Sequence, residues 1–358
     1  MSCDFEDGVA AFERNDYATA LSKYRSSAEK GDVRSQNFLG VMYDNGLGVT
    51  QDYAESVRWY RLAAQNGFSL AQHNLGVLYE EGTKVAKDYK EAVRWYLLAA
   101  KQGYAEAQYN LGFMYRNGKG VVQDYKEAVR WIRLAAQQEH SYAQNILGVM
   151  YNRGEGIAQD YKEAVRWWLL AAQQGDRGAQ YNLALMYRRG EGVGQDYKEA
   201  MRWCRLAAKQ GVSDAQFNLG LMYDKGQGVA KDYKEAVRWY RLAAQQGVLE
   251  AQFNLGFMYE NGKGVAQDYK EAVRWWLLAA KQGSVAAQNS LGIMYGNGRG
   301  VLQDYVRAHM WFYIAAVNGD KLSVENRTIA ARKMTPQQIE QAERMARECL
   351  ASNFSNFD

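Results

Sequence analysis

The stretch AQYNLGFMYRNGKG at residues 107–120, followed by DYKEAVRWIRLAA at residues 124–136, decides the fold, because close copies of it fill most of the chain. Its Asp-Tyr pair returns every 36 residues, and the aspartates of these pairs are Asp16, Asp52, Asp88, Asp124, Asp160, Asp196, Asp232, Asp268 and Asp304. Self-similarity at one fixed period indicates a solenoid, in which each repeat buries its apolar face only against its neighbours.

Each repeat predicts a first helix that ends at a glycine. In residues 34–45, Leu39, Met42 and Tyr43 stand at helical spacing. The segment stops at Gly46, because glycine readily adopts the positive φ that ends a helix.

A second helix follows after a short loop. Its N-cap is Asp52, whose carboxylate can accept hydrogen bonds from the free amide groups of the first turn, and Glu55 is placed to reach back, as in a capping box. The helix runs to Gly67, a glycine of the type that follows a helix C-terminus. Each repeat is therefore predicted to be an antiparallel helix pair.

Composition favours an all-α protein. The chain has 358 residues, of which 47% are hydrophobic, and a mean hydropathy of −0.51, which is typical of a soluble protein with a large core. It contains a single proline, where ordinary usage is about 5%, and proline breaks helix interiors. The net charge of +4 is too small to favour a nucleic-acid-binding protein.

The repeat, with Ala-Gln, Leu-Gly, Met-Tyr, Gly-x-Gly, Asp-Tyr and Trp at fixed spacing, resembles the Sel1-like repeat (SLR), a relative of the tetratricopeptide repeat. The resemblance implies a right-handed α-α solenoid, or superhelix, over residues 1–320. We expect a short first repeat at residues 4–31, with a tighter loop, and then eight repeats of 36 residues.

The last part of the chain, residues 321–358, is expected to form capping helices. Residues 321–333 predict one helix, and Thr335-Pro336-x-Gln338 is a helix start with proline at its first position. The polar helix at residues 336–351 is expected to cover the last open face.

Three repeats depart from the common pattern at a glycine. Glu139 replaces the glycine between two repeats, Lys84 the second loop glycine, and Ala184 the glycine of the Leu-Gly pair. The eighth full repeat also loses its Glu-Ala-Val-Arg pattern and has Arg307-Ala308-His309-Met310 instead, as expected next to a cap.

The resemblance places a binding surface on the concave side, which the first helices line. Residues shared by all repeats are explained by packing, whereas residues that vary are freer to meet a partner. The positions carried over from the family lie six and three residues before, and one, four and five residues after, the Leu-Gly glycine. The candidates named at these positions are Asn37, His73, Tyr109, Phe113, Arg116, Arg153, Tyr181, Arg188, Arg189, Phe217, Lys225, Phe253 and Phe257.

Two interpretations of these positions stay open. The aromatic side chains could anchor a peptide or a partner helix, or they could pack against the neighbouring helix. The charges, with Asp44, Glu80 and Glu81 early and arginines in the middle, could favour a ligand with an acidic stretch, or they could form a solvated mixed-charge face.

Catalytic and metal-binding interpretations are not favoured. The Asp-x-x-Glu pairs recur at helix starts and are explained by capping. Ser27-x-x-Lys30 matches a β-lactamase motif by letters only, because its companion motifs are missing. The thiols, Cys3, Cys204 and Cys349, form no disulfide or metal pattern, and the three histidines do not cluster with them. We therefore expect no enzyme activity, cofactor or metal.

The sequence predicts a protein–protein interaction scaffold or adaptor that binds a peptide or a partner domain, not nucleic acid. No apolar run is long enough to span a membrane. The alternative is a periplasmic or secreted bacterial SLR protein with a cell-envelope or host-interaction role, with β-lactam hydrolysis as one option; a third option is an engineered or recently expanded array. The chain as given predicts a cytoplasmic location, and a removed leader would make it periplasmic or secreted.

Overall fold

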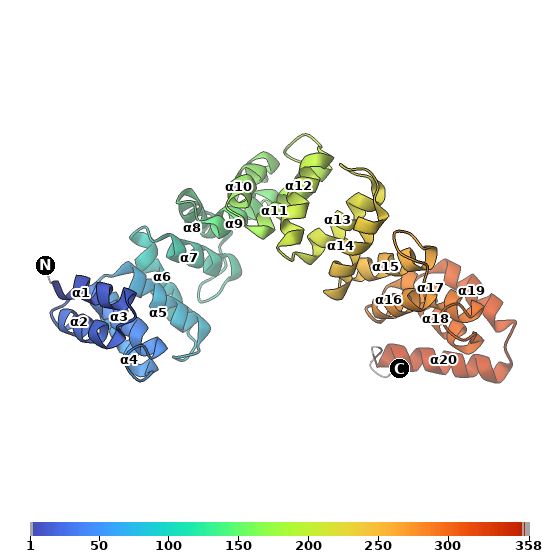
Figure 1. Ribbon diagram of the computed structural model, residues 1–358, viewed down its shortest axis with the longest axis horizontal. Helices are drawn as coiled ribbons and strands as arrows, with labels where there is room; N and C mark the ends of the chain where they lie inside the picture. The colour runs from blue at the N-terminus through green and yellow to red at the C-terminus, as the bar shows by residue number, and fades with distance from the viewer. Residues whose placement is uncertain (1–2, 353, 355–358) are drawn as a thin grey trace. The chain divides into compact units, whose positions relative to one another are not determined.

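The structure is a computed structural model that describes residues 3–352 and 354. These residues form α-helices and no strand (Figure 1). The first helices of the repeats are α1 (Cys3–Glu13), α3 (Val33–Asn45), α5 (Ser69–Glu81), α7 (Ala105–Asn117), α9 (Ser141–Arg153), α11 (Arg177–Arg189), α13 (Ser213–Lys225), α15 (Leu249–Asn261) and α17 (Val285–Asn297). The second helices are α2 (Tyr17–Glu29), α4 (Tyr53–Gln65), α6 (Tyr89–Lys101), α8 (Tyr125–Gln137), α10 (Tyr161–Gln173), α12 (Tyr197–Lys209), α14 (Tyr233–Gln245), α16 (Tyr269–Lys281) and α18 (Tyr305–Val317).

The chain divides into two compact bodies. The N-terminal body comprises residues 1–179 and 191–193, and the C-terminal body comprises residues 180–190 and 194–358. Within each body, helices that follow one another in the chain pack together, as an α-α repeat fold of the solenoid type requires.

The predicted helix ends are confirmed in the example repeat. Gly46 adopts φ 68° and ends α3, and Gly67 adopts φ 86° after α4. The Asp52 carboxylate accepts hydrogen bonds from the amides of Ala54 and Glu55. The second half of the capping box was wrong: the Glu55 carboxylate instead accepts from the guanidinium of Arg58, 2.9 Å away, because an arginine one turn further competes for it.

The hydrophobic clusters join parts of neighbouring repeats. In the N-terminal body, one cluster combines Val129 and Ile132 of α8 with Leu147 and Met150 of α9, and it is completed by Trp167 of α10. In the C-terminal body, Trp275 of α16 completes the cluster of α14 and α15 in the same way. The shared tryptophan thus packs against the preceding repeat, so no repeat has a complete core of its own.

The glycine of the Leu-Gly pair lets a large side chain, usually an aromatic ring, approach the first helix. A Cβ on Gly148 would lie 2.7 Å from the ring of Trp168, and a Cβ on Gly76 would lie 2.6 Å from the ring of Tyr96. Among the eight full repeats, only one has another residue, Ala184, in place of this glycine. In that repeat, Cys204 occupies the second-helix position that holds the large side chain in the other repeats. A small side chain on the second helix therefore matches the extra methyl group on the first.

A ladder of buried glutamines, which the sequence analysis did not single out, links the repeats. Gln144 donates to the carbonyl of Ala136 at the end of α8 and accepts from the side chain of Gln174 after α10. The same donation to the residue eight positions earlier, at 3.0–3.2 Å, is made by Gln36, Gln72, Gln108, Gln144, Gln216, Gln252 and Gln288. Each glutamine thus adds a second donor to a carbonyl in the last turn of a helix, which also accepts from a backbone amide three residues later.

Two of the departures from the pattern have local explanations. Glu139 adopts the left-handed conformation of the glycine that it replaces, with φ 65°. Lys84 is not in the left-handed region, and its ammonium instead lies 2.7 Å from the Asp44 carboxylate of the preceding repeat. The loop around Lys84 therefore uses an ion pair where other repeats use a glycine.

The C-terminal helices are α19 (Lys321–Ala331) and α20 (Pro336–Ala351). Thr335 and Gln338 form the capping box that the sequence predicts at the start of α20. The helix packs against α18 through Ala342 and Ala346, which join the terminal hydrophobic cluster. Both helices lie within the predicted C-terminal segment, and α20 packs against α18.

Candidate partner-binding surface

We use the term first-helix surface for the varying positions of the first helices, which lie six and three residues before and one, four and five residues after the Leu-Gly glycine. In the N-terminal body, the position three residues before the glycine touches the next repeat. Asn37 is buried and accepts from the amide of Asn74, 3.3 Å away. The ring of His73 lies 3.1 Å from the amide of Asn110, and burial lowers the pKa of His73.

The C-terminal body repeats this arrangement. The hydroxyl of Tyr181 accepts from the Asn218 amide at 2.9 Å, and burial raises the pKa of Tyr181 to about 12. The rings of Phe217 and Phe253 are half-buried, with centroids 5.9 Å from Tyr240 and 6.4 Å from Trp276. These side chains pack within the fold, and they also keep part of each ring open to solvent.

An aromatic cluster lies on α7 and α9 of the N-terminal body. The rings of Tyr109 and His140 are stacked, with centroids 4.8 Å apart and an interplanar angle of 22°. Tyr142 is next in the cluster, 6.4 Å from Tyr109, and 63% of its surface is exposed. Burial raises the pKa of Tyr109 and lowers that of His140, so both are neutral near pH 7.

Sequence reasoning missed Tyr142, although it lies six residues before the Leu-Gly glycine of its repeat. The residues at this position share no chemistry that would have marked it; in the other full repeats they are Arg34, Leu70, Glu106, Gly178, Asp214, Glu250 and Ala286. One signal could have identified it: only in this repeat does a tyrosine, Tyr142, follow two residues after a histidine, His140. Such repeat-specific aromatic residues are candidate anchors for a partner.

In two of the repeats, the residue directly after the Leu-Gly glycine is a phenylalanine. Phe113 is half-buried, and Phe257 is 41% exposed. A lysine ammonium lies over each ring, that of Lys119 at 5.5 Å from Phe113 and that of Lys263 at 5.1 Å from Phe257. Each body thus presents an aromatic face with a cation above it.

Two predicted arginines of the N-terminal body share one carboxylate. Glu155 lies 2.9 Å from the guanidinium of Arg116 and 3.4 Å from that of Arg153. Glu155 is partly buried; burial alone would raise its pKa, and the two guanidinium groups lower it overall. The three groups keep one net positive charge, which Arg153 presents with 63% of its side chain exposed.

The remaining predicted basic side chains lie in the C-terminal body. Arg188 donates to the Asn218 amide oxygen at 2.5 Å, and Arg189 and Lys225 are exposed. On the acidic side, Asp44 is paired with Lys84, and Glu80 accepts from the hydroxyl of Tyr96 at 2.9 Å. Much of the predicted acidic and basic charge is therefore already engaged within the fold.

The described residues contain no group of three His, Cys, Asp or Glu side chains arranged to hold a metal ion. Cys204 and Cys349 are free and buried, and burial raises the pKa of the Cys204 thiol to about 12. No helix in the described chain is long and apolar enough to cross a membrane.

Comparison with known proteins identifies the repeat. The sequence model of the Sel1 repeat matches residues 33–68, 69–104, 105–140, 141–176, 178–212, 213–248, 249–284 and 285–320. This chain belongs to the Sel1 repeat family. The matched segments divide the chain at the same spacing as its helix pairs, which confirms the predicted resemblance.

Two solved structures of Sel1 repeat proteins are similar to this one. A Sel1 repeat protein from Oxalobacter formigenes is 37% identical over 85% of this chain and 88% of its own, with a TM-score of 0.65. The protein c5321, described as a protective antigen present in uropathogenic Escherichia coli, is 35% identical over 98% of this chain and 93% of its own, with a TM-score of 0.55. No curated protein matches this chain in sequence.

Sel1 repeats mediate protein–protein interaction, and proteins built from them are generally scaffolds without catalytic activity. The interaction role that the sequence predicts therefore agrees with the family.

Proposed function

We propose that this chain is a non-enzymatic scaffold that binds a peptide or a partner domain on the first-helix surface. The observation that carries the proposal is a contrast in burial within the first helices. There, shared residues such as Leu147 and Gln144 are buried, whereas the repeat-specific Tyr142 and Phe257 are 63% and 41% exposed. Exposed aromatic side chains on an ordered helix are the usual anchors of protein interfaces.

The test compares two pairs of substitutions that remove apolar side chains. Phe113→Ser with Phe257→Ser removes the aromatic faces of the two bodies. Leu134→Ser with Leu278→Ser is the matched control on second helices, where the leucines are 37% and 41% exposed. Proteins retained from an extract of the source organism by the tagged native chain are quantified for each variant.

The proposal expects partners that the phenylalanine variant loses and the leucine variant keeps. Equal retention by both variants, or loss confined to the leucine variant, would refute it. Circular dichroism of both variants shows whether the helices are intact, so a folding defect is recognised separately.

We further propose that the partner carries an acidic stretch. Support comes from Arg153, whose side chain is 63% exposed and which carries the net positive charge of its group with Arg116 and Glu155. Arg153→Glu is expected to weaken partner binding about tenfold or more, and Arg166→Glu, on a second helix with a 64% exposed side chain, is the matched control. Equal affinity of the native chain and Arg153→Glu would remove the acidic-ligand proposal.

A further inference from the structure

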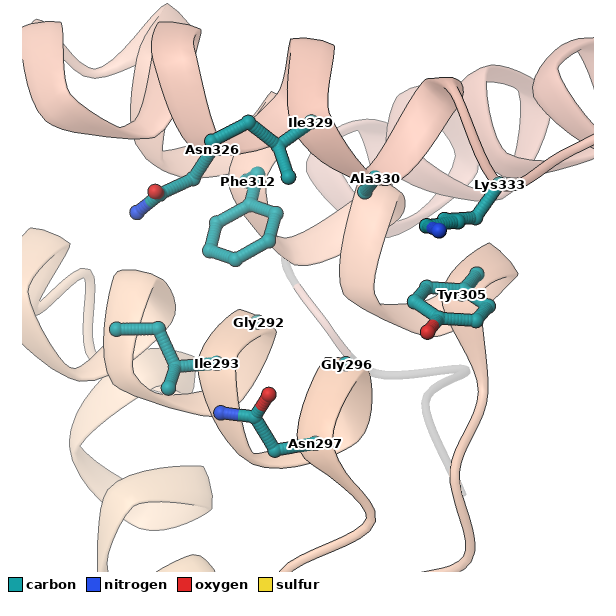
Figure 2. A pocket seen from close by; sticks show the side chains of 10 residues that line it. All are labelled: Gly292, Ile293, Gly296, Asn297, Tyr305, Phe312, Asn326, Ile329, Ala330 and Lys333. Atoms are coloured by element: carbon teal, nitrogen blue, oxygen red, sulfur yellow. The ribbon is translucent and has the colours of Figure 1, made fainter.

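A pocket of about 360 Å³ lies in the C-terminal body between α17, α18 and α19 (Figure 2). Its volume is within the usual range of ligand pockets, roughly 300–1,000 Å³. The ring of Phe312 stands in the middle, between Ile293 of α17 and Ile329 of α19, and Lys333 and Tyr305 stand together at one end.

The pocket exists because this repeat has lost side chains that the other repeats carry. Gly296 stands four residues after the Leu-Gly glycine, where the seven preceding full repeats have Asp44, Glu80, Arg116, Asn152, Arg188, Asp224 and Glu260. A Cβ on Gly296 would meet only the Cβ of Ala308, at 3.7 Å. The glycine is therefore not required for packing, and its effect is to leave space.

The partner of that position on the second helix is also shortened. In two repeats, the side chain four residues after the glycine accepts a hydrogen bond from a tyrosine hydroxyl: Glu80 from Tyr96 at 2.9 Å and Asp224 from Tyr240 at 3.4 Å. In the last repeat the corresponding residues are Gly296 and Phe312, so both the acid and the hydroxyl are missing.

A third side chain is shortened on α19. Ala330 follows Met294 by 36 residues, and this position is a methionine or leucine in each full repeat. Those side chains are buried, for example Met258 at 2% and Met294 at 1% exposed. The alanine at this position shortens the wall that faces Phe312.

The walls of the pocket combine apolar surface with unengaged polar groups. Ile329 is 59% exposed at its edge. Within the part of the chain that the structure describes, the Lys333 ammonium makes no ion pair and the Asn297 amide makes no hydrogen bond. The counterparts of Asn297 in other repeats, Asn117 and Asn261, each donate to the carbonyl four residues earlier at 2.8 Å.

We propose that this pocket binds an apolar side chain of a partner peptide, next to an acidic residue of that peptide. The apolar side chain packs on Phe312 between Ile293 and Ile329, and the carboxylate is held by the ammonium of Lys333, at the end of the pocket where Tyr305 stands. A peptide fits better than an enclosed small molecule because Ile329 and Asn297, on opposite sides of the pocket, are both exposed, which leaves a path for the chain to continue. This inference rests on the proposed scaffold function and names a separate contact point for the partner.

The test uses the tetrapeptide acetyl-Gly-Leu-Asp-Gly-amide as probe, followed by ligand-observed NMR with the full chain. Comparison peptides replace Leu by Ser, or Asp by Asn. The free acid 4-methylpentanoate, which has the same apolar group and a carboxylate, distinguishes a small-acid site from a peptide site.

Two variants act on the pocket. Gly296→Asp with Phe312→Tyr rebuilds the acid–tyrosine pair of Asp224 and Tyr240, so it fills the pocket with a pair that the fold already accepts. Its control is Asn152→Asp, which adds a carboxylate at the same position of another repeat. Lys333→Gln removes the cation, and Lys321→Gln, at the other end of α19, is its control.

The proposal expects the probe to bind the native chain and both controls. Binding should weaken about tenfold or more for each comparison peptide, for Lys333→Gln and for the refilled pocket. Absence of binding to the native chain, equal binding to the refilled pocket, or binding of 4-methylpentanoate without the peptide would overturn it. None of these variants touches Phe113 or Phe257, so failure here is distinct from failure of the proposed scaffold function.

Discussion

Glu139 holds a backbone conformation that suits glycine. Its φ is 65°, while the equivalent glycines, such as Gly103 with φ 88°, have open space around the missing Cβ. The positive φ of the backbone, and not a lack of space for a Cβ, therefore favours glycine at this position.

Glu139→Gly is expected to raise the free energy of unfolding by about 1 kcal/mol, because it relieves a left-handed non-glycine residue. Gly103→Ala is the reverse change and is expected to lower it by a similar amount. Urea denaturation followed by circular dichroism measures both, and a destabilised Glu139→Gly would contradict this explanation.

The glycine of the Leu-Gly pair is constrained by a different force. At Gly148 the obstacle is the Trp168 ring at 2.7 Å, and the ring is also fixed by a hydrogen bond from its Nε1 to the carbonyl of Asn145 at 3.1 Å. In the repeat of Ala184, the ring position holds Cys204, which explains why a methyl group is tolerated there.

Gly148→Ala is therefore expected to lower the free energy of unfolding by about 1–3 kcal/mol through overpacking. In a double-mutant cycle with Trp168→Cys, which copies the natural pair of Ala184 and Cys204, the coupling should favour the double variant by at least about 0.5 kcal/mol. Simple additivity of the two changes would show that the ring is not the obstacle.

At the scale of the element, helix starts and ends follow closely from the sequence because their signals are local. Asp52 needs only the two amides after it, and Thr335 and Gln338 cap α20 from within one turn. The prediction that the Glu55 carboxylate accepts a hydrogen bond from the N-cap amide was wrong, because the competing donor, Arg58, is equally local and carries a full charge.

The roles of other residues could not be predicted because their partners belong to other helices. Gln144 bonds residues eight positions before and 30 positions after it, and Asn37 meets a residue 37 positions later. The recurrence of glutamine in each full repeat indicated a packing role, but only the spatial register identifies which carbonyl it satisfies. The first-helix aromatics were left with two interpretations for the same reason.

The glutamine ladder is expected to matter for stability. Gln144→Leu keeps the side-chain size but removes the buried donor to the carbonyl of Ala136 and the acceptor of the Gln174 amide, which should cost about 1–3 kcal/mol in the free energy of unfolding. Gln173→Leu, at an exposed position of α10, should change it by less than about 0.5 kcal/mol. Denaturation curves in urea compare the two, and equal effects would argue against the ladder.

At the scale of the whole molecule, all three histidines respond to pH in the same direction. Burial lowers the pKa of His73, His140 and His309 below the ordinary value of 6.5. The unfolded chain therefore binds more protons than the folded chain once the pH falls below about 6.5, so stability present above that pH is lost as the pH falls.

The chain is accordingly expected to be less stable at pH 5.5 than at pH 7.5. These pH values lie about one unit below and one unit above the ordinary histidine pKa. His140→Asn should reduce the difference, because asparagine can accept from the Ala143 amide as His140 does at 3.1 Å without titrating. Denaturation midpoints at the two pH values measure this. A native chain equally stable at both would contradict the assignment of buried neutral histidines.

We propose that shared residues build the fold and that repeat-specific residues of the first helices meet the partner. Hydroxyl-radical footprinting with mass spectrometry, on the chain alone and with a captured partner, tests this division at side-chain resolution. We predict that Tyr142 or Phe257 is oxidised in the free chain and protected in the complex, while Leu134 and Leu278 are oxidised equally in both. Protection of the second-helix leucines, with Tyr142 and Phe257 unchanged, would contradict it.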